Sequence, residues 1–363
     1  MKILVLKETN PFEKRVAIVP EIVAKYQKFG FEIFVEKSAG EKSAIGDDEF
    51  EKAGAKIIVN SAEILPQIDI IISVQNINFD LTKIKKGVIF IAMLNQHFQK
   101  EKIDKLINAA VSPFALESVP RITRAQTMDV LSSQSNLAGY ISVLSAVSQM
   151  QKCVPMMMTA AGTVAAAKIM VLGAGVAGLQ AIATAKRLGA IVCAFDVRAV
   201  AKEQVQSLGA KFIEVVAENK DTETKGGYAK EMDEEYKKRQ EKLIAETIAK
   251  QDVVIATALI PGKKAPILIN EEMVRSMKSG SVIVDLAAVN GGNCALTKLN
   301  EVVEIGKVKI IGYENFPSLV AIDASKLYAR NIFNFVELLL DKETKQIKIN
   351  LEDEILKASL VTL

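Results

Sequence analysis

The sequence predicts an α/β protein of two domains, each built on a parallel sheet with helices on both faces. Three observations predict this fold class. Short apolar runs alternate with amphipathic segments along most of the chain. Residues 154–198 read as strand, glycine turn, helix, second strand and acid. The length of 363 residues is enough for two full-sized hydrophobic cores.

The glycine turn follows an apolar run at 168–172 that suits a strand buried on both faces. Gly173 permits the tight turn, and Gly175 lets the backbone come up against a pyrophosphate. Gly178 lets the next helix lie close to the sheet. With all parts at the expected spacing, the stretch predicts a Rossmann dinucleotide-binding domain.

The groups around this turn extend the predicted cofactor site. The helix starts at Val176 and Ala177, whose N–H groups point at the phosphates. The second strand ends at Asp196, followed by Val197 and Arg198. A carboxylate there accepts hydrogen bonds from a ribose diol and repels a 2′-phosphate, so the site should prefer NAD(H) to NADP(H). Arg198 argues the other way.

Composition excludes several classes of protein. The chain has 46 basic and 43 acidic residues, so its net charge of +3 does not favour nucleic acid. Three cysteines without CxxC spacing and a single histidine, His97, indicate no metal site. Residues 154–185 carry one charge and could be mistaken for a membrane span. Their glycine and proline spacing favours a buried strand and helix, and we expect no direct membrane insertion.

The N-terminal domain is expected at 1–130, completed by 318–363, and the Rossmann domain at 131–317. The long stretch at 319–340 reads as a helix that leads back to the first domain. Apolar runs predict six strands in the first domain, at 2–6, 31–36, 56–59, 68–74, 88–93 and 112–118.

A dense run of polar side chains lies where the first domain is expected to end. It includes Arg121, Gln126, Asp129 and Ser132. An apolar stripe then predicts a helix over 136–149 with a serine as its N-cap. By itself Asp129 is more typical of a helix-start acid, but together the four residues indicate a ligand site at the mouth of an interdomain cleft.

Four other segments of the second domain carry expectations. The loops at 256–262, which contains Ala258 and Leu259, and at 285–293 follow predicted strands at the ligand edge of the sheet. Methionines 156–158 are expected in the core of a strand. Residues 218–242 carry 15 charges in 25 positions. The loop at about 218–232 is either an exposed insertion or a mobile lid with Tyr228 at its centre.

Long motifs of the chain resemble the NAD(H)-binding component of proton-translocating nicotinamide nucleotide transhydrogenases. The resemblance spans essentially the whole chain and is carried by 121–140, 156–163, 173–187, 226–232, 256–262 and 285–293. It implies a homodimer that docks onto a separate NADP(H)-binding component. It also implies a membrane-spanning component that moves protons, which would hold this chain at the cytoplasmic face of the inner membrane.

The same resemblance implies roles for individual residues. Arg121, Gln126, Asp129 and Ser132 would surround the nicotinamide and its ribose. Asp196 would hold the adenosine ribose. Tyr228 would belong to a loop that closes over the bound nucleotide.

Two alternatives stay open. Alanine dehydrogenases share the two-domain plan, but their chemistry needs a proton donor and acceptor. The Lys, His and Asp of that family correspond here to Gln75, Met93 and Val289, none of which exchanges a proton near neutral pH. Hydride passing between two nicotinamide rings needs only approach, orientation and exclusion of water. Val289 also departs from the transhydrogenase pattern, where an acid is often seen. A non-enzymatic NAD(H) sensor is the third possibility.

Overall fold

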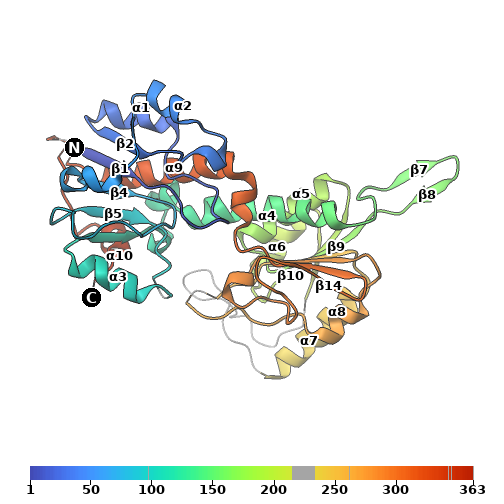
Figure 1. Cartoon of the computed structure of the whole chain (residues 1–363). Helices are drawn as coiled ribbons and strands as arrows, with labels where there is room; N and C mark the ends of the chain where they lie inside the picture. Colours follow the sequence, from blue (N-terminus) through green and yellow to red (C-terminus); the bar gives the residue numbers. More distant parts are fainter. Residues whose placement is uncertain (97, 215–233, 261, 342, 345, 363) are drawn as a thin grey trace. The chain divides into compact units, whose positions relative to one another are not determined.

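The computed structural model describes residues 1–96, 98–214, 234–260, 262–341, 343–344 and 346–362. The chain forms two compact units. The first comprises Met1–Gln134 and Pro317–Leu363, and the second comprises Ser135–Phe316 (Figure 1).

The first unit contains a parallel sheet in the order β3-β2-β1-β4-β5-β6. The order reverses between β1 and β4, which makes the adjacent ends of these two strands its switch point. Each strand lies within one of the six predicted apolar runs, so this part of the prediction is confirmed. The strands are β1 (Lys2–Val5), β2 (Glu32–Glu36), β3 (Lys56–Ile58), β4 (Ile70–Ile72), β5 (Ile89–Ala92) and β6 (Ser112–Ala115).

Helices cover both faces of this sheet. Alternate residues of β1 show why: Ile3 and Val5 pack with residues of α1, α2 and α9, whereas Leu4 packs with α3 on the other face. Consecutive residues of β1 are therefore apolar because both faces of the strand are covered by helices. The helices are α1 (Pro20–Lys28), α2 (Asp47–Lys52), α3 (Lys100–Asn108), α9 (Ala321–Leu338) and α10 (Glu354–Ser359).

The second unit has a sheet in the order β11-β10-β9-β12-β13-β15-β14. Its order reverses between β9 and β12, and all pairs are parallel except β14 with β15. The antiparallel edge strand β14 was not anticipated from the sequence. The strands are β9 (Lys168–Leu172), β10 (Ile191–Phe195), β11 (Lys211–Ile213), β12 (Val253–Ala256), β13 (Val282–Asp285), β14 (Val302–Ile305) and β15 (Val308–Ile311).

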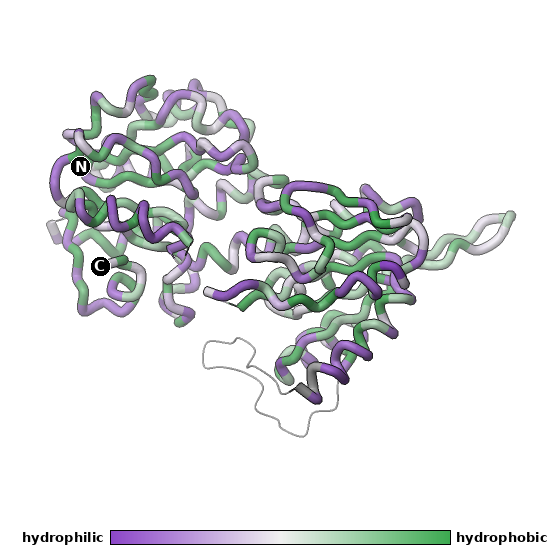
Figure 2. The backbone as a smooth tube through the Cα atoms, turned by 60° about the horizontal axis from the view of Figure 1, so that its bottom comes forward, coloured by the Kyte–Doolittle hydropathy of each residue, from purple (hydrophilic) through white to green (hydrophobic). Residues whose placement is uncertain are grey.

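The two faces of this second sheet are also covered by different helices. Val171 of β9 packs with α4 and α5, whereas Met170 and Leu172 pack with α7 and α8. Figure 2 shows the resulting concentration of hydrophobic residues along the strands. The helices are α4 (Val130–Gln149), whose first turns belong to the first unit, α5 (Val176–Arg187), α6 (Ala201–Ser207), α7 (Glu234–Ile248) and α8 (Glu271–Ser276).

One prediction about the core is wrong. Methionines 156–158 do lie at a strand, but β7 (Met157–Thr159) pairs only with β8 (Gly162–Val164) in a hairpin that projects from the rest of its unit (Figure 1). Met156 is 62% exposed and Met158 is 79% exposed. An apolar strand is buried only where another layer covers it, and nothing among the described residues covers this one.

Candidate functional site

The glycine turn of the second unit is shaped by close backbone contacts. Gly173 has φ +95°, a conformation that glycine adopts without strain. A Cβ at Gly178 would lie 1.9 Å from the carbonyl oxygen of Gly173, so only glycine fits there. A Cβ at Gly175 would meet nothing within 4 Å. Gly173 and Gly178 are thus required by the fold, whereas Gly175 faces open space.

Thr257 anchors this turn from the neighbouring strand. It follows β12, and its hydroxyl donates to the carbonyl oxygen of Gly173 at 2.9 Å. Its backbone N–H donates to Leu172 O at 2.8 Å. Sequence reasoning missed Thr257. Its place directly after β12, at the ligand edge of the sheet, could have indicated that it contacts the turn after β9. The turn after β9 is therefore held across the switch point by the residue that follows β12.

Asp196, at the end of β10, is bound on both carboxylate oxygens. Oδ2 accepts from Ala174 N at 2.7 Å and from Arg198 Nη2 at 2.8 Å. Oδ1 accepts from the backbone N and from Nε of Arg198, at 2.8 and 3.0 Å. The Arg198 guanidinium, which could attract a 2′-phosphate, is thus paired with the Asp196 carboxylate, which would repel one. Val197 lies between them and is partly buried.

The loop after β12 is locked by a buried asparagine. The side-chain oxygen of Asn293 accepts from Ala258 N at 3.0 Å, and its Nδ2 donates to the carbonyl oxygens of Ala258 at 2.9 Å and Pro266 at 2.8 Å. Asp285, at the end of β13, accepts from Asn293 N at 2.8 Å. Leu259 is exposed beside this anchor. Both loops therefore follow strands as predicted, and Asn293 ties them together, which sequence reasoning missed.

Helix α4 lies against the first turn of α5. A Cβ at Gly139 would be 2.0 Å from the carbonyl oxygen of Ala177, so the two helices touch backbone to backbone. Val176, at the start of α5, is partly exposed beside them. Gly139 was not singled out in the sequence, because a single glycine inside a helical pattern gives no sign of what it touches.

In the first unit, three of the four polar candidates lie in consecutive turns. Gln126 is exposed in the 3₁₀ segment Thr123–Met128, and Asp129 follows it. One carboxylate oxygen of Asp129 accepts from Ser132 N at 2.8 Å, and the other accepts from the Ser132 hydroxyl. Asp129 therefore caps α4, and the predicted helix start at 136 with a serine cap is wrong. Arg121 is exposed ahead of this turn.

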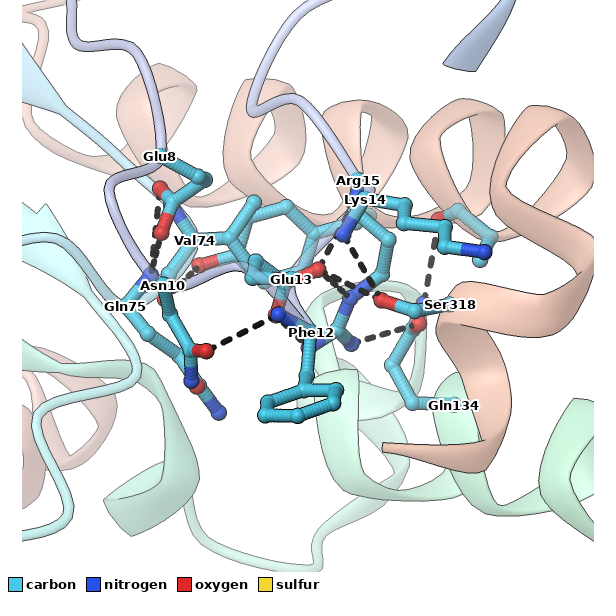
Figure 3. Close-up of polar contacts among 12 residues, drawn as sticks. Glu8, Asn10, Phe12, Glu13, Lys14, Arg15, Val74, Gln75, Gln134 and Ser318 are labelled. Atoms are coloured by element: carbon cyan, nitrogen blue, oxygen red, sulfur yellow. Dashed lines mark hydrogen bonds and ion pairs between the residues drawn. The ribbon is translucent and has the colours of Figure 1, made fainter. Parts of the chain in front are cut away.

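Next to α4 the first unit buries a group of charged side chains (Figure 3). Arg15 grips Glu13 with two parallel bonds, Nε to Oε1 at 2.8 Å and Nη2 to Oε2 at 2.6 Å. Its Nη1 donates to Gln134 Oε1 at 2.8 Å. Burial alone would raise the pKa of Glu13, but the Arg15 guanidinium holds that pKa below its ordinary value. The pair joins the loop after β1 to the first turns of α4.

Glu8 is a second buried carboxyl in this group (Figure 3). It accepts from Val74 N at 2.7 Å and from Gln75 N at 3.2 Å, in the loop after β4. Burial and the charge of Glu13 raise the pKa of Glu8 to about 7 despite these bonds. Gln75 itself is exposed. Glu8, which can exchange a proton near neutral pH, therefore lies beside Gln75, a position whose own side chain cannot.

Tyr228 and the loop at about 218–232 lie outside the described residues. Val289, in the loop after β13, is 50% exposed. Within the part of the chain that the structure describes, every helix is too short or too polar to cross a membrane.

Comparison with known proteins identifies the family. Residues 4–138 match the model described as alanine dehydrogenase/PNT, N-terminal domain, and residues 142–363 match the corresponding C-terminal domain. A protein of Rhodospirillum rubrum that is named as the first part of NAD(P) transhydrogenase subunit alpha is 49% identical over 369 residues, covering 100% of this chain and 96% of that protein. The chain belongs to the family of NAD(P) transhydrogenase alpha subunits.

Solved structures agree with this family. A transhydrogenase from Sinorhizobium meliloti has a TM-score of 0.89 and 46% identity, covering 100% of this chain and 98% of that one. An L-alanine dehydrogenase has a TM-score of 0.80 at 24% identity, covering 99% and 94%. The second likeness extends to the fold only. The predicted fold class, two α/β domains with parallel sheets, is confirmed.

Proposed function

We propose that this chain binds NAD(H) and passes hydride from NADH to NADP⁺ held on a partner component of a transhydrogenase. The observation that carries the proposal is the glycine turn at Gly173–Gly178, with open space in front of Gly175 and Asp196 held at its side. It occurs in a member of the NAD(P) transhydrogenase alpha family.

The residues of the turn fit a dinucleotide. The backbone N–H groups of Val176, Ala177 and Gly178 open α5, a helix of 12 residues, where they have no carbonyl partner within the helix and attract a phosphate. Gly175 leaves room for that phosphate to approach. Ala258 and Leu259 would line the nicotinamide side of the site, on the loop that Asn293 locks.

The pairing of Asp196 with Arg198 supports a preference for NAD(H). The carboxylate stands at the ribose position, where it would repel a 2′-phosphate. The guanidinium that could attract such a phosphate is engaged by that carboxylate instead. NADP(H) would accordingly bind on the partner component.

When bound, NADH supplies the hydride from its nicotinamide ring, and this chain would hold that ring in the position required for transfer. Arg121, Gln126, Asp129 and Ser132 would orient the amide and ribose of the nicotinamide. The loop that contains Tyr228 would exclude water. Transfer between two rings needs no proton donor, so the rate would depend on approach and orientation.

The wider assembly is also proposed here. Relatives are named as the whole or a portion of a subunit alpha, which supports the existence of further components. We propose an NADP(H)-binding component and a membrane-spanning component that couples the reaction to proton translocation. The chain would be cytoplasmic and peripheral, held at the cytoplasmic face of the inner membrane by these partners.

A second copy of this chain is the proposed partner of the hairpin β7–β8. A two-stranded hairpin is at best marginally stable alone in water, and an exposed apolar patch marks an interaction surface. At its base lies a shallow, open apolar hollow of about 670 Å³, lined by Leu144, Val147 and Pro155 among others. Because one chain carries both the projecting hairpin and an apolar hollow, two copies related by a two-fold axis could each offer both surfaces to the other. Met158→Glu should give a monomer in light scattering, whereas a dimer that persists would exclude the hairpin as the interface.

A second candidate function, an amino acid dehydrogenase, is favoured by one observation. Glu8, with a pKa of about 7, is able to exchange a proton near neutral pH. It lies beside Gln75, where alanine dehydrogenases carry a lysine. Against this role, both oxygens of Glu8 accept hydrogen bonds from the backbone of the loop after β4.

One assay separates the candidates. The purified chain is mixed with NADH, an NADP⁺ analogue and the purified NADP(H)-binding component, and reduction of the analogue is followed. We expect reduction only when both proteins are present, and none of pyruvate plus ammonia. Reduction of pyruvate by the isolated chain would favour the amino acid dehydrogenase. NADH binding without reduction in any combination would favour a sensor.

A further inference from the structure

Asn331 of α9 bridges the two sides of the turn at Asp129. Its carboxamide oxygen accepts from the hydroxyl of Ser133 at 2.7 Å. Its Nδ2 donates to the carbonyl oxygen of Thr127 at 2.7 Å. Because a carbonyl can only accept, the nitrogen must face Thr127, and the orientation of the amide is fixed by its partners. The side chain is buried, with 7% of its surface exposed.

The two bridged groups stand directly beside candidate site residues. Thr127 follows Gln126, and Ser133 follows Ser132. Between them the backbone changes from the 3₁₀ segment Thr123–Met128 to α4, with Asp129 at the change. Asn331 therefore fixes the distance between Thr127, in the 3₁₀ segment, and Ser133, in α4. It does so from α9, a helix that carries none of the candidate site residues.

Loss of this bridge would leave no buried group without a partner. Thr127 O also accepts from Asn334 Nδ2 at 3.1 Å. The Ser133 hydroxyl also lies 3.2 Å from the carbonyl oxygen of Val130. A variant without the Asn331 amide thus removes the connection across the turn but not the last hydrogen bond of either group, so its effect on stability should be small.

We propose that Asn331 is a positioning residue for hydride transfer, acting through the bridge from Thr127 to Ser133. The inference rests on the proposed function, in which Gln126, Asp129 and Ser132 orient the nicotinamide. A displacement of about 1 Å in a reacting pair can reduce a rate by about 100-fold. Because the phosphate and adenosine contacts proposed above lie in the second unit, looser orientation should lower the rate of transfer more than the affinity for NADH.

The test compares Asn331→Leu, which keeps the volume without the amide, with Asn334→Ala. Asn334 bonds the same Thr127 carbonyl but not Ser133, so it is the matched control. Single-turnover hydride transfer to NADP⁺ on the partner component, NADH affinity and melting temperature are measured. For Asn331→Leu we expect transfer about 10-fold slower, with NADH affinity within about twofold of the unmodified chain. Asn334→Ala should leave the transfer rate unchanged.

A double-mutant cycle with Ser133→Ala tests the bridge itself. If both side chains act through one bond, the double variant is no slower than the slower single variant. Ser133→Ala removes the bond to the Asn331 oxygen and keeps the bond from Asn331 to Thr127, so it reports on the bridge even if Asn331→Leu folds poorly. Equal rates for Asn331→Leu and the unmodified chain, or additive losses in the cycle, would overturn the proposal. Absence of transfer by the unmodified chain would instead refute the proposed function, and with it the basis of the inference.

Discussion

At the switch point of each sheet, two neighbouring strands end in loops that are tied together, but the ties differ. In the first unit the carboxylate of Glu8, after β1, accepts from Val74 N and Gln75 N, after β4. In the second unit the hydroxyl of Thr257, after β12, donates to the carbonyl of Gly173, after β9. In the first unit the backbone N–H groups of Val74 and Gln75 are therefore already occupied by a carboxyl group of the chain itself.

This difference is the reason for placing the proposed dinucleotide on the second sheet. A phosphate needs unoccupied N–H donors and room for close approach of the backbone. Around Gly175 the second unit has that room. At Val74 and Gln75 the N–H donors of the first unit are already taken by the carboxyl group of Glu8. The following changes test the comparison.

The largest combined effect, on stability and on NADH binding together, is expected at the glycine turn. Gly178→Ala places a Cβ 1.9 Å from the Gly173 carbonyl, so the helix must move away from the strand. We expect a loss of about 3 kcal/mol of unfolding free energy and no measurable NADH binding. The matched change Gly175→Ala meets no protein atom within 4 Å. It should leave the melting temperature unchanged and weaken NADH binding at least about tenfold, because its methyl group fills space proposed for the phosphate.

Calorimetry and NADH titration of the two glycine variants distinguish fold from ligand. A Gly175→Ala protein that binds NADH as well as the unmodified chain would place the phosphates elsewhere. A Gly178→Ala protein with normal stability would mean that the close contact between α5 and β9 relaxes easily.

The next largest effect is expected at the buried ion pair of the first unit. Arg15→Met leaves Glu13 charged and buried without its cation, which should lower the unfolding free energy by about 3–5 kcal/mol. The double variant Arg15→Met with Glu13→Leu removes both charges and should regain much of that loss. Denaturant titration of the two proteins measures the difference. Equal stabilities would show that the pair acts through its hydrogen bonds to Gln134 and Ser318 and not through charge.

The sequence was sufficient for features that depend on local pattern. Continuous apolar runs identified β1 and β9 as strands, because their apolar residues alternate between two faces that are both covered by helices. The glycine spacing identified the turn, because Gly173 and Gly178, the two glycines that the fold requires, lie within a few residues of each other. The cap of α4 was missed because Asp129 and the serines are all good caps, and only the backbone path decides which one is used.

Features that depend on distant groups could not be predicted. Asn293 locks Ala258, which is 35 residues away, and nothing local marks an asparagine for that role. Asn331 meets Thr127 across 204 residues. Methionines 156–158 look the same in sequence whether another layer covers them or water does. In each case the deciding fact is which segment lies opposite, and a one-dimensional pattern does not contain it.

A smaller, pH-dependent effect is expected from Glu8. Its pKa is about 7 in the folded chain against an ordinary 4.5, so the folded state favours the protonated form. The stability linked to this proton is complete below about pH 4.5 and is lost as the pH rises through 7. The loss amounts to about 3 kcal/mol at most. Denaturation at pH 5 and pH 8 should show this decline, and Glu8→Gln should reduce it. An equal decline in both proteins would assign it to another group.

The smallest effect is expected at Arg124, within the same motif as Arg121. Its guanidinium makes two bonds to Asp353, the N-cap of α10, at 2.6 and 2.9 Å. Arg124→Ala breaks an exposed ion pair, so the melting temperature should fall by less than about 2 °C. Hydride transfer should not change, because Arg124 acts on α10, whereas Arg121→Ala should slow it. Equal slowing by the two variants would mean that the motif acts as one structural segment, and the assignment of Arg121 to the nicotinamide would lose its support.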